Sequence, residues 1–289
     1  MTDEITEKYI QELLSTGTGT EGSLLIPKKI HAVLIKAVDK ALIPRSEAMM
    51  YIGPAMIPGS SYDLNLEAED AMDVRLIGEG GEIILDSDEY SSTNIKPKKY
   101  GVSVRITGEM KEDSQFPLLS LNVSKAGKRF VENETRLILT ALQGCTNAVA
   151  GGAAITIPDF TRGMQYLEDA DYESTSALVG TEVVNDMRNI DTFVEANRMG
   201  NREILATGFL GTVLGMNFFR FSTRAAPSTT YSKYAYVYDR AEAYAIAEKR
   251  TITVEGFKLP IFDMEGAALT QRLAVALVRD NAVCRISTS

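Results

Sequence analysis

Several residue types that carry catalytic and metal-binding chemistry are scarce in this chain. Its 289 residues include one histidine, two cysteines and no tryptophan. A single imidazole excludes an HExxH zinc site and leaves His31 as the one conventional histidine base. His31 flanks an apolar stripe at helical spacing between residues 27 and 43, which favours a packing or surface role. We therefore expect no cofactor, no metal and no enzymatic activity.

The sequence also has no apolar run of the length that a transmembrane helix needs, which excludes a membrane-spanning chain. Lys and Arg number 30 against 39 Asp and Glu, giving a formal net charge of −9. A chain this acidic is a poor candidate for gripping nucleic-acid phosphates. Cys145 and Cys284 lie far apart and outside any CxxC spacing, which suits a reducing compartment and ordinary burial.

The first part of the chain is predicted to be an arm. Ile5, Tyr9 and Leu13 repeat every four residues, as in a short helix, and a tract of small residues follows at 15–23. Residues 17–22 fit the pattern G-x-G-x-x-G. A dinucleotide site needs a strand before that pattern and a helix at its third glycine, and neither is expected here, so we interpret the tract as a linker.

Residues 62–107 are predicted to be extended, with Val102, Val104 and Ile106 alternating with polar residues. Residues 86–99 are too polar to be buried within one subunit, which favours a long hairpin that projects from the body. Opposite charges on such a hairpin suit docking onto another copy, where they set register more than affinity. The expected contact residues are Arg75, Glu82, Asp86, Asp88, Glu89, Lys96, Lys98 and Lys99.

A long helix is predicted over residues 114–149, where apolar residues recur in steps of three and four. About 35 residues at 1.5 Å each would span about 50 Å, which is too long for a compact globule and suggests a spine. The remainder alternates short helices (159–169, 181–189) with strands (177–179, 218–221, 234–238, 251–254, 273–278) and an apolar tail at 282–286. This is an α+β chain without regular βαβ alternation. Elements that cannot bury themselves within one subunit imply assembly.

The order of these parts resembles the major capsid protein of tailed double-stranded DNA viruses, the Hong Kong 97-type capsid fold. The resemblance rests on the Gly22-to-Pro27 step, the extended stretch, the long helix, the glycine turns at 208–221 and the segment from Arg272 to Ile286. It implies an arm (1–45), a peripheral domain in three parts (46–61, 108–150 with the spine helix, and 248–289), an extended loop (62–107) and an axial domain (151–247).

Some members of this family crosslink a loop lysine to an asparagine of a neighbour, assisted by a glutamate. The matching positions here hold Asp263 and Thr270, neither of which can serve, so we expect no covalent crosslinks. Only some 25 residues precede the arm motif, so any scaffold would come from another protein.

The resemblance implies a structural protein that self-assembles, through pentamers and hexamers, into an icosahedral shell around viral double-stranded DNA. That DNA is enclosed without sequence-specific binding, and an acidic wall keeps it from sticking. Portal, scaffolding and cement proteins are the other expected partners, and no membrane is involved. The expected location is the virion, assembled in the host cytoplasm. Two alternatives stay open, namely an encapsulin that encloses a cargo enzyme and a soluble enzyme with an unrecognised carboxylate site.

Overall fold

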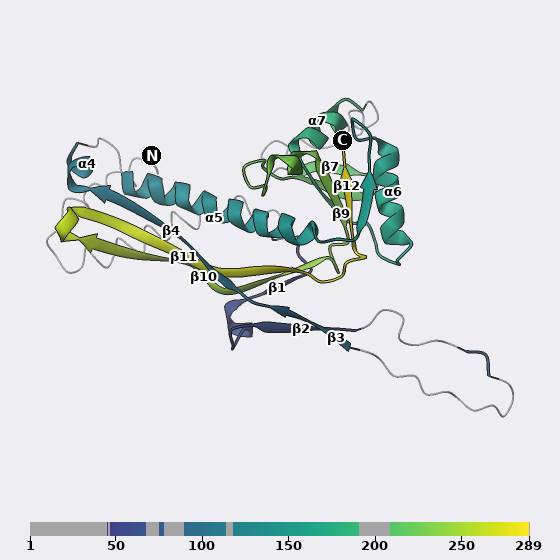
Figure 1. Ribbon diagram of the computed structural model, residues 1–289, viewed down its shortest axis with the longest axis horizontal. Coiled ribbons are helices and arrows are strands. Elements are labelled where there is room, and N and C mark those ends of the chain that lie inside the picture. Colours follow the sequence, from purple (N-terminus) through teal and green to yellow (C-terminus); the bar gives the residue numbers. More distant parts are fainter. Residues whose placement is uncertain are drawn as a thin grey trace, which may run out of the picture.

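The computed structural model describes residues 45, 47–67, 75–77, 90–113, 118–190 and 209–288. They form an elongated molecule in which a long, narrow sheet with one helix along it leads to a second, rounder body (Figure 1). A two-stranded ribbon leaves the region where the two meet. The mixture of helices with mostly antiparallel sheets confirms the predicted α+β class. The helices expected at 5–13 and 27–43, including His31, lie outside the described residues.

The long sheet has four strands in the order β1 (Met50–Ile52), β10 (Tyr244–Leu259), β11 (Met264–Leu277) and β4 (Lys98–Thr107). The strands β10 and β11 form a long antiparallel hairpin, and β4 pairs antiparallel to β11 along ten residues. The turn of the hairpin is a short 3-10 helix, η3 (Pro260–Phe262), and α4 (Gly108–Glu112) follows β4 beside it. Sequence periodicity predicted only short pieces of β10 and β11.

The spine helix α5 (Leu118–Leu142) lies along one face of this sheet. Val123, Ala126 and Phe130 pack against β11, and Ile138 and Leu142 continue the stripe into the core of the second body. The helix is shorter than predicted, because Gln143 and Gly144 turn the chain and residues 147–150 form a strand instead. Its 25 residues correspond to about 37 Å.

The second body is a six-stranded sheet whose core includes the edge-to-face pair Phe160 and Phe218. The strands run in the order β5 (Asn147–Ala150), β12 (Val283–Ser287), β9 (Tyr234–Tyr238), β6 (Ser176–Val179), β8 (Met216–Arg220) and β7 (Phe209–Val213). The helices α6 (Ile157–Glu168) and α7 (Thr181–Arg188) pack on it. The expected tail at 282–286 is therefore an inner strand, which pairs with β5 on one side and β9 on the other.

The ribbon consists of β2 (Tyr62–Glu67) and β3 (Tyr90–Ile95), paired antiparallel. Its inward side chains Leu64, Leu66 and Ile95 pack with Ile52 of β1 and with alanines of β10. The ribbon is thus fixed to the body at its root. The stretch 62–107 is not a single hairpin, because β4 turns away and joins the long sheet.

None of the helices in the described ranges has the length and apolar character that crossing a bilayer requires.

Candidate assembly surfaces

Four of the expected contact residues fall in the described ranges, and three of them, the lysines, lie close together at the junction of ribbon and body. Lys96 sits between β3 and β4, and Lys98 and Lys99 open β4; all three are exposed. Arg75 is exposed as well. The other four expected residues, Glu82, Asp86, Asp88 and Glu89, lie outside the described ranges. The structure therefore brings the three lysines together where the chain passes from ribbon to body, and their contact with another copy stays a prediction.

The direction of the ribbon is set by side chains of the body. Arg279 donates from Nη2 to the backbone oxygen of Glu67 at 3.2 Å, at the outer end of β2. The same guanidinium donates from Nε to Glu242 at 2.8 Å. Lys249 donates to the backbone oxygen of Gly59 just before the ribbon. Because these contacts hold the chain before β2 and at its outer end, the ribbon leaves the body in a defined direction.

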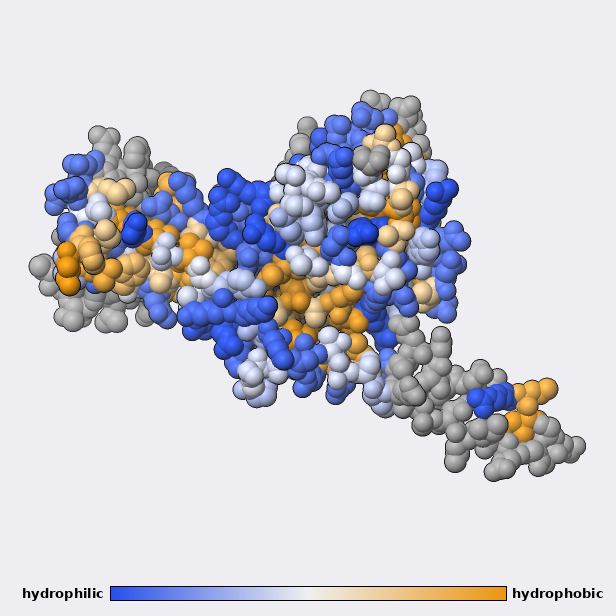
Figure 2. All heavy atoms as spheres, in the orientation of Figure 1, coloured by the Kyte–Doolittle hydropathy of each residue, from blue (hydrophilic) through white to orange (hydrophobic). Residues whose placement is uncertain are grey.

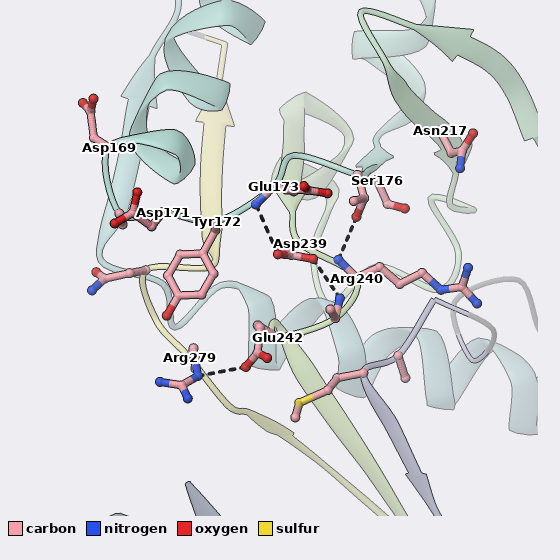
Figure 3. Close-up of a pocket in the computed structure, with 16 residues that line it drawn as sticks. Asp169, Asp171, Tyr172, Glu173, Ser176, Asn217, Asp239, Arg240, Glu242 and Arg279 are labelled. Atoms are coloured by element: carbon pink, nitrogen blue, oxygen red, sulfur yellow. Dashed lines mark hydrogen bonds and ion pairs between the residues drawn. The ribbon is translucent and has the colours of Figure 1, made fainter. Parts of the chain in front are cut away.

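A pocket of about 1050 Å³ lies where the two bodies join, lined by residues of both (Figure 3). The carboxylate of Asp239 accepts from the backbone amides of Glu173 and Ala241, at 3.2 and 2.8 Å. The hydroxyl of Thr175 accepts from the amide of Arg240 at 2.8 Å. These polar atoms hold the connection between β9 and β10 in place. Nowhere in the described ranges do His, Cys, Asp and Glu side chains form a group that could hold a metal ion.

A buried ionic cluster joins the start of the described chain to the spine helix, and we call it the Arg45 cluster. The guanidinium of Arg45 makes a bidentate pair with Glu134 of α5, at 2.8 and 2.6 Å, and reaches Glu248 of β10 at 3.2 Å. Glu248 also accepts from Gln271 at 2.7 Å and from the hydroxyl of Tyr51. The network thus joins Arg45, which precedes β1, to one residue from each of four elements: β1, α5, β10 and β11.

The electrostatics of the Arg45 cluster follow from burial. The carboxylate side chains of Glu134 and Glu248 are only 4% and 2% exposed. Burial raises the pKa of Glu134, and the hydrogen bond from Arg45 lowers it only in part. Burial and the bond to Glu248 raise the pKa of Tyr51, so that its hydroxyl remains a donor. Sequence reasoning missed this cluster, because nothing in the local pattern links positions 89 and 203 residues apart.

The far end of the long hairpin carries an exposed apolar surface, which we call the apolar tip. Ile261 is 91% exposed and Phe262 64%, and Leu259 and Met110 are exposed beside them. Figure 2 shows hydrophobic side chains at this end of the molecule. Sequence reasoning missed this surface. The signal for it was the apolar pair Ile261 and Phe262, which directly follows Pro260 between two strand segments.

The two positions considered for crosslinking are both engaged within the subunit. Asp263 closes the hairpin turn with a φ of 45°, and its carboxylate lies so close to Gly108 that a Cβ there would fall 2.2 Å from Oδ2. Thr270, in the middle of β11, accepts from Arg250 Nη2 at 2.7 Å and shares a 3.0 Å hydrogen bond with Thr253. The absence of crosslinks stays a prediction.

An elongated chain with a projecting ribbon and an exposed apolar tip is a subunit built for a larger assembly. The family model described as phage capsid protein matches residues 89–286, and the chain belongs to this family. It is a major capsid protein, a structural component of the virion that forms an icosahedral shell, and not an enzyme. Family membership therefore confirms the predicted function and gives no support to the encapsulin alternative.

Solved structures share the fold at low sequence identity. A chain of Gordonia phage Cozz has a TM-score of 0.67 at 12% identity, covering 86% of this chain and 87% of that one. A chain of Mycobacterium phage Che8 has a TM-score of 0.62 at 12% identity, covering 88% and 90%. The capsid of cyanophage P-SCSP1u has a TM-score of 0.61 at 11% identity, covering 86% and 89%. These similarities confirm the Hong Kong 97-type fold. No curated protein matches the chain.

Proposed function

We propose that copies of this chain form the pentamers and hexamers of the shell through the ribbon and the apolar tip, and that the shell encloses double-stranded DNA. The observation that carries this proposal is the apolar tip, where Ile261 and Phe262 are 91% and 64% exposed. Burying two such side chains against a neighbour is worth about 1.5–3 kcal/mol each. In a closed shell every subunit contacts several neighbours at once, so many modest contacts together stabilise the assembly.

The two bodies correspond, in this proposal, to the peripheral and axial domains. The long sheet with α4 and α5 is the peripheral domain, and the six-stranded sheet with α6 and α7 is the axial domain. Some of the expected boundaries move. The strands β5 and β12 join the axial domain because β12 pairs with β5 on one side and with β9 on the other. The strand β4 joins the peripheral domain because it pairs with β11. Residues 1–45 keep their assignment as the arm.

The charged residues of the extended loop set the register between neighbours. The exposed Lys96, Lys98 and Lys99 stand at its root, and the sequence places Asp86, Asp88 and Glu89 further out along it, so that opposite charges can meet between copies. The test is Lys98→Glu with Lys99→Glu, compared with the charge-preserving pair Lys98→Arg with Lys99→Arg. We expect the first pair to slow shell formation in light scattering and the second to leave it unchanged; equal rates would contradict the role of these charges.

The DNA is held without sequence-specific contacts. A formal net charge of −9 disfavours adhesion of phosphates to the wall, so that the genome can pack without sticking. Assembly takes place in the host cytoplasm, with portal, scaffolding and cement proteins as partners. Particles purified from infected cells should contain nuclease-resistant double-stranded DNA. Particles that instead hold a folded cargo protein would contradict this part of the proposal.

The shell is held without covalent bonds between subunits. Asp263 offers no amide for a lysine to displace, and Thr270 has no basic group and is hydrogen-bonded to Arg250 and Thr253. Denaturing gels of assembled particles should show a single monomer band. A ladder of covalent multimers would overturn this part of the proposal.

A further inference from the structure

The exposed side of α5 carries a basic stripe in an otherwise acidic chain. Lys125, Arg129 and Arg136 follow one another at helical spacing on the side away from the long sheet, with Lys128 next to them, and all four are exposed. The eleven steps from Lys125 to Arg136 correspond to about 16 Å of helix. Figure 2 shows hydrophilic side chains over the middle of this helix. We call Lys125, Lys128, Arg129 and Arg136 the basic face.

Little in the described part of the chain neutralises the basic face. Arg129 pairs with Glu132 at 2.6 Å, while no ion pair between described residues involves Lys125, Lys128 or Arg136. The remaining acid of the helix, Glu134, points the other way and is bound by Arg45. Within the described ranges, three cations without a carboxylate partner therefore stand on one helix face of a protein whose formal net charge is −9.

The complementary charge lies in the N-terminal segment of the same chain, residues 1–26. This segment has five carboxylates and a single lysine, Lys8. The five are Asp3, Glu4, Glu7, Glu12 and Glu21. Apolar residues recur among them at Ile5, Tyr9 and Leu13, and an apolar side chain, Leu121, is 47% exposed one turn before Lys125. The two surfaces match in charge and in apolar character.

The chain also arrives at the right place. Arg45 is held against Glu134 in the middle of α5, so that the residues preceding it start beside this helix. A helix is about 10–12 Å across, whereas 44 extended residues reach on the order of 145 Å, so the segment can pass around α5 to its basic face. Tethering gives it an effective concentration in the millimolar range for that face. A separate polyanion has no such advantage and is repelled at long range by the net charge.

We propose that the basic face of α5 is the docking site for the acidic N-terminal segment of the same chain. The contact goes beyond the function proposed above, because shells could form with or without it. It holds the arm on the spine helix through several exposed ion pairs, each weak and sensitive to salt.

Disulfide trapping in the full chain tests this contact. The variant Glu7→Cys with Lys128→Cys should form a disulfide within one chain, seen as faster migration on a non-reducing gel. The native Cys145 and Cys284 are buried and do not compete. Glu7→Cys with Arg162→Cys, whose second site is exposed on α6, is the matched control and should not close.

Charge variants then separate docking from chance encounter. Adding Lys125→Glu with Arg136→Glu should slow trapping by about tenfold, as should 0.5 M salt, because several exposed ion pairs are lost. Reversing the partner charges as well, with Glu4→Lys and Glu12→Lys, should restore the rate; this rescue also excludes misfolding as the cause.

The inference would be overturned if the charge variants formed the disulfide at the wild-type rate, or if the disulfides linked different chains. It would also be overturned if duplex DNA bound wild-type protein through the basic face. Light scattering on the same samples reports shell formation. Shells that form without trapping would defeat this inference and leave the proposed function intact.

Discussion

Replacing Arg45 by methionine should destabilise the subunit by about 3 kcal/mol at neutral pH. The substitution removes the bidentate pair at 2.8 and 2.6 Å and leaves the carboxylate of Glu134, only 4% exposed, without its cation. Breaking a buried pair in this way costs about 3–5 kcal/mol. We take the lower end because Arg45 itself is 24% exposed and Glu248 keeps its bonds from Tyr51 and Gln271.

The loss should depend on pH in a defined direction. Burial already raises the pKa of Glu134, and Arg45 is the group that lowers it, so the variant raises this pKa further. A carboxyl whose folded-state pKa lies above its unfolded value contributes stability that is present at low pH and is lost as the pH rises through the folded pKa. The destabilisation should therefore be larger at pH 7.5 than at pH 5.

The assay is thermal unfolding followed by far-ultraviolet circular dichroism on dilute, unassembled protein. About 3 kcal/mol corresponds to a fall in Tm of roughly 6–12 °C. Arg162→Met, on the exposed surface of α6, is the control and should leave Tm unchanged. Adding Glu134→Gln to Arg45→Met should restore part of the loss, because it removes the stranded charge. An equal loss at both pH values, or no rescue, would refute the reasoning.

Three further predictions concern the tip, the sheet and the cysteines. Ile261→Ser with Phe262→Ser should leave Tm unchanged and reduce shell yield several-fold in sedimentation, because both side chains are exposed in the subunit; an undiminished yield would contradict the assembly role of the tip. Gly266→Ala should cost about 1–3 kcal/mol in chemical unfolding, because its Cβ would meet the carbonyl oxygen of Val104 at 2.3 Å, whereas Gly256→Ala, with its nearest contact at 4.0 Å, should be neutral. Burial raises the pKa of both thiols, that of Cys284 to about 12, so a disulfide reagent at pH 8 should label neither thiol in the native protein and both after denaturation; rapid native labelling would count against the packing described.

Much of the fold was predictable because its signals are local. The alternation of Val102, Val104 and Ile106 marks β4, and the helical spacing of Val123, Ala126 and Phe130 marks α5. The end of α5 was not predictable in this way. The apolar residues after Cys145 continue a helical pattern, and they become strand β5 because β12 pairs with them from more than 130 positions away.

The long hairpin and the site were harder to predict for a related reason. The strand β11 faces the helix with Ala267, Leu269 and Leu273, while its other face carries Gly266, Ala268 and other small or polar residues that give no strand signal. The Arg45 cluster depends on three charged residues that only the tertiary fold brings together. The loop lysines, by contrast, were predicted as contact residues from the local run of charge alone, and this stays a prediction.

Electron microscopy of the purified recombinant protein, combined with light scattering over a range of concentrations, tests the central claim most directly. We expect closed icosahedral particles, or the pentamers and hexamers from which they form. A protein that remains a monomer at every concentration would contradict the account.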